Sequence, residues 1–170
     1  MTINAVLHNI RSMYNVGSIF RTADAAGVDK IYLCGITPTP IDKFGRRRTQ
    51  IAKVALRAED YVNWQYTKFT TSLLDKLKKD GFIIIAIEQA KNSVPYYNLP
   101  AKVLQKNKIA LIVGNEIKGL PRPILKQANY IIEIPIRGKK ESLNVAVAFG
   151  IVAFSLIERL LRREKWISTK

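Results

Sequence analysis

The strongest constraint on the fold comes from two uninterrupted runs of aliphatic side chains. The stretches "FIIIAI" (82–87) and "IALIVG" (109–114) contain no polar alternation, so a strand built from either has to be covered on both faces. Shorter apolar runs recur along the chain, and helical patterns stand between them. Buried strands that alternate with helices are typical of a parallel sheet between two helical layers. We therefore predict a three-layer α/β fold.

The expected strands lie at 3–8, 30–36, 82–89, 108–114 and 130–136, and the expected helices at 15–27, 71–81, 121–129 and 143–157. A chain of 170 residues suits one domain. We expect a single domain over 1–170, with its core at about 4–161 and a short basic tail after Leu161. The helix 143–157 is apolar all round apart from Asn144 and Ser155, and such a helix is expected to be buried.

The charge balance indicates a polyanionic partner. Lys and Arg number 28 against 13 Asp and Glu, for a net charge of +15, and an excess of this size favours nucleic acid. A membrane surface is the rival partner, but no separate amphipathic helix with a basic face and aromatic anchors is present. The longest apolar run is also shorter than the ~20 residues that cross a bilayer. We expect a cytoplasmic protein.

The sequence contains few cysteine or histidine side chains that could bind a metal ion or form a disulfide. Cys34 is the one cysteine and His8 the one histidine, so no disulfide within the chain and no zinc cage can form. Cys34 is expected to be a small core residue and His8 a structural residue at a strand end. No metal site is predicted.

The irregular stretch 37–50 carries a concentration of positive charge. Asp42 is the only acid within this stretch, and a solvated charged loop is the alternative to contact with RNA phosphates, which we favour. The expected RNA-binding cations are Lys43, Arg46, Arg47, Arg48, Lys53 and Arg57.

Polar side chains follow three expected strands, where ligands bind in open α/β sheets. In "NVGSIFRTADAAG", Asn15 is the expected N-cap, and Arg21 falls on the first turns of the helix, where the macrodipole disfavours a cation. An anionic ligand would explain Arg21; an arginine that extends into solvent is the alternative. A glycine at position 114 would let a ligand approach the backbone closely.

The third junction, "GKKESLN", places Ser142 and Asn144 at a helix start, and Ser142 is the expected cap. The chain contains no G-x-G-x-x-G fingerprint and no P-loop, which disfavours nicotinamide and nucleoside triphosphate enzymes.

These three junctions together resemble the motifs of the SpoU (TrmH-like) branch of the SPOUT RNA methyltransferases. The first is similar to N-x-G-x-x-x-R-T-A at 15–23, the second to G-N-E-x-x-G-L at 114–120, and the third to I-P-x-x-G-x-x-x-S-L-N-V at 134–145. The resemblance covers about 9–161. Two positions depart from it: Ile136 stands where the family often has Met, and Arg57 where a Gly is common.

The resemblance implies an S-adenosylmethionine-dependent ribose 2′-O-methyltransferase of tRNA or rRNA, with a C-terminal trefoil knot and a homodimeric assembly. Chains generally avoid threading, so the knot comes from the resemblance alone. The implied catalytic residues are Asn15, Arg21, Glu116, Ser142 and Asn144. The implied cofactor-binding residues are Ile87, Glu88, Gly114, Asn115, Ile134, Ile136, Ser142 and Leu143.

The family's proposed role for the arginine at position 21 is that of a base, but a guanidinium is effectively never neutral in a protein. We expect Arg21 to hold a phosphate and to stabilise charge on the attacking oxygen, with Glu116 as a proton acceptor or as a partner of Arg21. A catalytically silent RNA-binding protein and a base N-methyltransferase are the alternatives. We expect no separate RNA-binding domain before Asn9, which favours a minimal enzyme.

Overall fold

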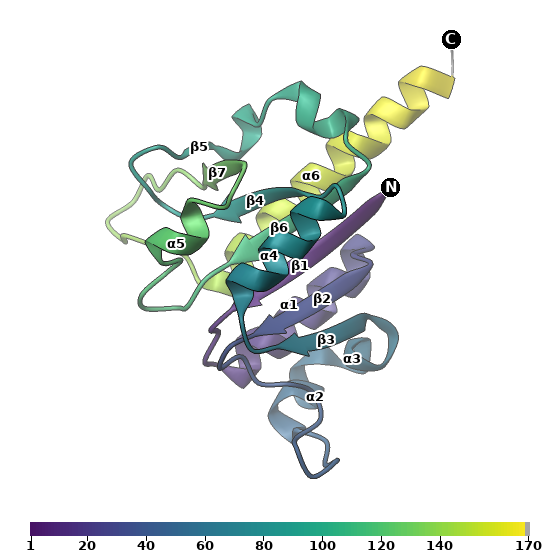
Figure 1. Cartoon of the computed structure of the whole chain (residues 1–170), viewed down its shortest axis with the longest axis vertical. Helices are drawn as coiled ribbons and strands as arrows, with labels where there is room; N and C mark the ends of the chain where they lie inside the picture. The colour runs from purple at the N-terminus through teal and green to yellow at the C-terminus, as the bar shows by residue number, and fades with distance from the viewer. Residues whose placement is uncertain (169–170) are drawn as a thin grey trace.

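The computed structural model describes the backbone of residues 1–168 and the side chains of residues 1–162. Seven parallel strands form one sheet in the order β3-β2-β1-β6-β4-β7-β5 (Figure 1). The strands are β1 (Thr2–His8), β2 (Lys30–Cys34), β3 (Asn63–Thr67), β4 (Ile83–Ile87), β5 (Val94–Pro95), β6 (Lys108–Val113) and β7 (Tyr130–Glu133). The predicted α/β class with a parallel sheet is confirmed.

The helices are α1 (Met13–Ala26), α2 (Thr49–Ala55), α3 (Ala58–Tyr61), α4 (Thr70–Lys79), α5 (Arg122–Leu125) and α6 (Val145–Ser168), with 3-10 turns η1 (Tyr96–Asn98) and η2 (Ala101–Gln105). None of the helices in the described residues has the length and apolar character needed to cross a membrane. The basic tail after Leu161 continues α6 to Ser168, and its side chains beyond Arg162 lie outside the described residues.

The core lies on both faces of the central strands, as their composition requires. On β1, Ile3, Ala5 and Leu7 pack with α1 and α6, whereas Val6 faces α4 and α5 on the other side. The central strands β1, β4 and β6 are almost wholly buried. This confirms the three layers and fixes where ligands can reach the sheet, namely at the loops after the strands.

The edge strand β3 was not expected, because "NWQYT" contains only two large apolar side chains, Trp64 and Tyr66. In the structure Trp64 is partly buried and Tyr66 is exposed. Pairing with β2 from Lys30↔Asn63 to Cys34↔Thr67 defines it instead. The predicted trefoil knot stays a prediction.

Helix α6 is only partly buried within the single chain. Phe149 and Leu156 face the core, but Val147 and Phe154 are about half exposed, at 51% and 49%. Where α6 crosses α1, a Cβ on Gly150 would lie 3.4 Å from Cγ2 of Thr22. The helix therefore has one apolar face that the single chain leaves uncovered.

Candidate active site

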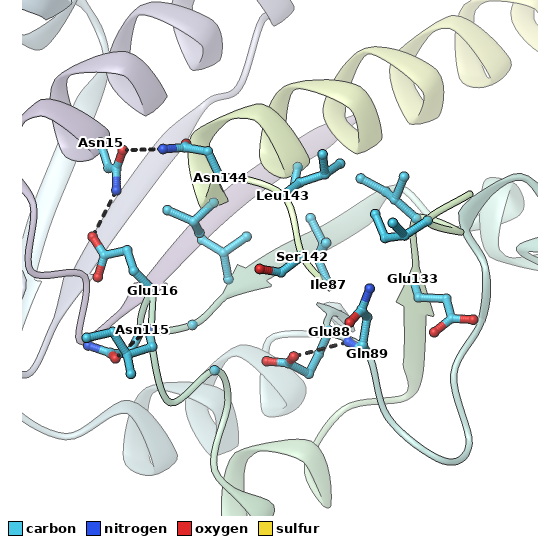
Figure 2. A pocket seen from close by; sticks show the side chains of 18 residues that line it. Asn15, Ile87, Glu88, Gln89, Asn115, Glu116, Glu133, Ser142, Leu143 and Asn144 are labelled. Atoms are coloured by element: carbon cyan, nitrogen blue, oxygen red, sulfur yellow. Dashed lines mark hydrogen bonds between the residues drawn. The ribbon is translucent and has the colours of Figure 1, made fainter. Parts of the chain in front are cut away.

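The main pocket lies at the carboxyl edge of β4, β6 and β7, next to the start of α6 (Figure 2), and has a volume of about 510 Å³. This volume is typical of small-molecule sites. All eight expected cofactor-binding residues line it, as do four of the five expected catalytic residues, namely Asn15, Glu116, Ser142 and Asn144. Arg21 does not line it. The fold therefore brings together, around one pocket, three motifs that lie far apart in the sequence.

Asn144 is the N-cap of α6, where Ser142 was expected. Its Oδ1 accepts a hydrogen bond from the backbone N–H of Ala146 at 2.8 Å. Since this fixes the amide oxygen toward the helix, the Nδ2 group faces away and donates to Oδ1 of Asn15 at 3.0 Å (Figure 2). Asn144 therefore caps one motif and contacts another.

Asn15 was expected to be the N-cap of α1, but Ser12 is the N-cap. Helix α1 begins at Met13, and the Ser12 hydroxyl caps it by accepting from the backbone N–H of Asn15 at 3.3 Å. The Asn15 side chain is thereby free to bridge motifs: its Nδ2 donates to Oε1 of Glu116 at 3.0 Å. A continuous line Asn144–Asn15–Glu116 connects the three junctions.

Glu116 is held by three donors. The backbone N–H groups of Arg11 and Ser12 each donate to its carboxylate at 3.0 Å, in addition to Asn15. Burial alone would raise the pKa of Glu116, but these hydrogen bonds outweigh burial and lower the pKa below its ordinary value. A carboxylate stabilised in this way is a weak proton acceptor. Neither a hydrogen bond nor an ion pair joins it to Arg21 among the contacts of the described side chains.

The loop 114–119 is closed on itself. A Cβ on Gly114 would lie 2.5 Å from the carbonyl carbon of Gly119. The expectation was that a ligand approaches the backbone here, but the chain itself makes the close approach. Gly119 has a φ of +61° and in turn packs against Glu88. Oε2 of Glu88 accepts from the backbone N–H of Leu120 at 2.6 Å. Glu88 therefore holds this wall of the pocket in place.

The opposite wall is the irregular segment 134–144, whose peptide groups belong to no strand or helix. Ile87, Ile134 and Leu143 supply apolar surface, and Glu88 and Glu133 supply negative charge. Ser142 lies in the middle of the pocket, as Figure 2 shows, between Glu116 and Ile87. Apolar walls, uncommitted peptide groups and two carboxylates fit a ligand with a planar heterocycle and a cationic end. Gly119 and Val145 of the motifs also line the pocket, whereas the sequence did not indicate the lining residues Gln89, Val113, Ile117, Glu133 and Ala148.

Arg21 lies in the third turn of α1, eight residues after its start, and is exposed. The expectation that it sits on the first turns, against the macrodipole, is therefore wrong, because the helix begins earlier than the motif. It is paired with no acid among the described side chains. Any ligand it holds lies outside the pocket.

The basic stretch is less free than its sequence indicates. Nε of Arg46 pairs with Asp42 at 2.9 Å, whereas Arg47 reaches Glu59 at 3.5 Å and also pairs closely with Asp60. Asp42 is the only acid within the stretch itself, but the fold brings Glu59 and Asp60 of α3 beside it. The remaining expected RNA-binding cations, Lys43, Arg48, Lys53 and Arg57, lie in or next to this loop. Of these, Arg57 alone is paired with an acid among the side chains of residues 1–162.

Comparison with known proteins gives a consistent result. The model of the SpoU rRNA Methylase family matches residues 2–154. A tRNA (guanosine(18)-2′-O)-methyltransferase of Borreliella burgdorferi is 30% identical over 155 residues, which are 91% of this chain and 66% of that protein.

Two solved structures are also similar. An AdoMet-bound rRNA methyltransferase from Sinorhizobium meliloti has a TM-score of 0.83 and 28% identity, over 94% of this chain and 57% of that one. The A. aeolicus TrmH/SpoU tRNA modifying enzyme has a TM-score of 0.80 and 27% identity, over 99% and 79%. The chain spans 57% to 66% of the length of the curated relatives that it matches.

Proposed function

Since the chain belongs to the SpoU rRNA methylase family, we propose that it transfers a methyl group from S-adenosylmethionine to a ribose 2′-hydroxyl of tRNA or rRNA. The observation that carries this proposal is the convergence of all three motifs on one pocket, tied together by the Asn144–Asn15–Glu116 hydrogen bonds. The relatives named for tRNA and rRNA methylation support RNA as the substrate class. The net charge of +15 supports it independently.

The main pocket would hold the cofactor. Ile87, Ile134, Ile136 and Leu143 would pack against its adenosine, and the peptide groups of 134–144 would meet the heterocycle edge. Glu88, Gly114 and Asn115 complete the wall on the other side. When bound, S-adenosylmethionine supplies an electrophilic methyl group. An AdoMet-bound relative with the same fold supports this occupant.

Positioning is the main contribution of the remaining residues. Asn144 and Asn15 would orient the ribose hydroxyl beside Ser142, and Glu116 would fix both amides. Because three donors engage Glu116 and its pKa is lowered, we assign it to orientation and not to proton acceptance. Arg21 would hold the phosphate of the target nucleotide from outside the pocket and stabilise charge on the attacking oxygen.

We also propose a homodimer in the cytoplasm, built as one domain over 1–170 with its core at about 4–161. The uncovered apolar face of α6, with Val147 and Phe154, supports a second copy as its cover. Sedimentation at micromolar concentration tests this. A monomer, or a dimer unaffected by Phe154→Glu, would contradict it.

The proposed activity is tested by titration calorimetry with S-adenosylmethionine and by transfer of labelled methyl groups to total tRNA and rRNA. Digestion to nucleosides and mass spectrometry then identify the product. We expect a 2′-O-methylated nucleoside. Cofactor binding without transfer to any RNA would favour a catalytically silent RNA-binding protein, and a methylated base would indicate the N-methyltransferase chemistry instead.

A further inference from the structure

A second hollow, of about 450 Å³, opens beside the main pocket. Asn115, Ile117 and Gly119 line both, so the loop 115–119 forms a wall of each. The new hollow lies at the carboxyl ends of β1 and β2, with His8, Asn9 and Ile36 in its lining. Apart from the shared wall, its lining contains no residue that we assign to cofactor binding or methyl transfer.

The floor of this hollow is held rigidly around Asn9, which has a left-handed φ of +55°. Its Oδ1 accepts from the backbone N–H of Ile36 at 3.0 Å, and its backbone oxygen accepts from Nδ2 of Asn115 at 2.8 Å. Gly35 packs so closely on Asn9 that a Cβ there would overlap Oδ1. Asparagine adopts this region more readily than other side chains do, and these contacts make the floor of the hollow a fixed surface.

His8 belongs to the same floor. Because Oδ1 of Asn9 faces Ile36, its Nδ2 faces Nε2 of His8, at 3.1 Å, and must donate to it. The imidazole is then neutral and carries its proton on Nδ1, which donates to the Thr70 hydroxyl at 2.8 Å. Burial, which lowers the pKa of His8, acts in the same direction. With both nitrogens engaged, the ring offers a ligand only its carbon surface.

Two apolar side chains in the lining of the hollow are open to solvent, and a third, Phe69, lies outside the lining at the same edge of the sheet. Ile36 is 66% exposed and Ile117 is 77% exposed. Phe69, at 60%, directly precedes Thr70, the residue that His8 contacts. Three large apolar side chains left open at one edge of a sheet indicate a surface that a flat ligand covers.

Cations accompany these apolar groups. Arg11 and Lys118 line the hollow, and Nζ of Lys68 lies 5.3 Å from the centre of the Phe69 ring. Within residues 1–162, none of these three side chains forms an ion pair with a carboxylate. Apolar platforms beside unpaired cations match the alternation of bases and phosphates in a single RNA strand.

We propose that this hollow, the flanking-nucleotide site, takes the unstacked base of an RNA nucleotide next to the methylated one. The base packs on Ile36, Ile117 and Phe69, and Arg11, Lys68 and Lys118 contact the adjoining phosphates. The site rests on the proposed function, because it places the RNA strand across the wall it shares with the cofactor pocket. It reads a single strand and not a duplex, whose bases are stacked inside.

The test is the double variant Ile36→Ser with Phe69→Ser. Neither side chain lines the cofactor pocket, and serine at position 69 is a better N-cap for α4 than phenylalanine, so we expect a folded protein. Fluorescence anisotropy with an oligouridylate of about 12 nucleotides measures RNA affinity. We expect affinity to fall about fivefold or more, since stacking on side chains contributes this much per base. Affinity for S-adenosylmethionine by calorimetry should stay unchanged.

The matched control is Tyr97→Ser, an exposed aromatic in η1 that lines neither hollow. It should leave oligouridylate affinity unchanged. A 4-thiouridine oligonucleotide should crosslink to peptides that contain Ile36, Phe69 or Ile117. Unchanged affinity in the double variant, or conversion of a dimer to a monomer by it, would overturn the proposal. If the wild-type protein does not bind S-adenosylmethionine and the double variant still loses oligouridylate affinity, this site is upheld and the proposed methyl transfer is rejected.

Discussion

Nδ2 of Asn144 donates to Oδ1 of Asn15 at 3.0 Å, across 129 positions of the sequence. The same Asn144 side chain caps α6 through its oxygen. One amide therefore serves two purposes, stability of a helix and orientation of a neighbouring amide, and the two can be separated because different atoms perform them.

Asn144→Ala should lower both stability and turnover. Loss of the cap costs about 1 kcal/mol of unfolding free energy, and loss of the Nδ2 donor leaves Oδ1 of Asn15 without its partner, so that Asn15 is held by Glu116 alone. Asn144→Ser keeps a capping oxygen but has no amide to donate to Asn15. Urea unfolding should therefore find Asn144→Ser near wild type, while its turnover falls as in Asn144→Ala. Equal turnover in Asn144→Ser and wild type would show that capping is the whole role of this residue.

Glu116 should make stability depend on pH in the acid range. Its pKa is lowered in the folded protein, so the stabilisation it supplies is complete above its ordinary pKa of 4.5 and is lost as pH falls through the lowered value. Denaturant unfolding between about pH 3 and 6 should show this loss. In Glu116→Gln an NH2 group replaces one carboxylate oxygen and faces a donor, so stability should be lower at neutral pH and should vary less below pH 4.5. An unchanged pH profile in this variant would contradict the assignment.

Much of the central sheet follows from sequence, and much of the site does not. The apolar runs at β4 and β6 can only be buried strands, and the motifs identify most pocket residues. No local pattern, however, could indicate that Asn15 meets Asn144 and not the start of its own helix. The cap of α1 was misplaced for the same reason: Ser12 lies just before the motif, and helix starts depend on which oxygen reaches the free N–H groups.

Arg57 shows how structure can explain a departure from a family pattern. The family commonly has glycine there, and Arg57 has a φ of +74°, a region that favours glycine. Arg57→Gly should therefore stabilise the fold by up to about 1 kcal/mol, less a small loss from its exposed ion pair with Asp60. Thermal unfolding measures this. Gly27→Ala is the converse control, since Gly27 has a φ of +75° and open space around it, and it should destabilise. A lower melting temperature in Arg57→Gly would reject the strain argument.

The basic loop should separate into structural and RNA-binding arginines. Arg47 is the cation beside the buried Glu59, so Arg47→Gln should cost more than about 1 kcal/mol of stability. Arg46→Gln breaks an exposed pair and should cost less than about 1 kcal/mol.

The salt dependence of RNA binding tests which cations of this loop contact phosphates. Lys43, which pairs with no acid among the described side chains, and the exposed Arg46 should each reduce the salt dependence by about one phosphate charge when neutralised. Replacement of Arg46, Arg47 and Arg48 together should reduce it by up to about three. A salt slope unchanged in the triple variant would make the loop solvated surface only.

Arg21 offers the sharpest test of the proposed chemistry, because it lies outside the cofactor pocket. Arg21→Ala should lower turnover roughly 10²-fold or more if the guanidinium stabilises charge on the attacking oxygen, with cofactor affinity near wild type. Arg21→Lys should fail almost as badly, since an ammonium cannot replace the planar fork that holds phosphate and ribose oxygens together. Ser18→Ala, three positions before Arg21 on α1 and outside the pocket lining, serves as a control that should keep activity. Single-turnover methylation with saturating cofactor measures the effect. Full activity in Arg21→Ala would leave Arg21 as a solvent-facing residue on the outer side of α1.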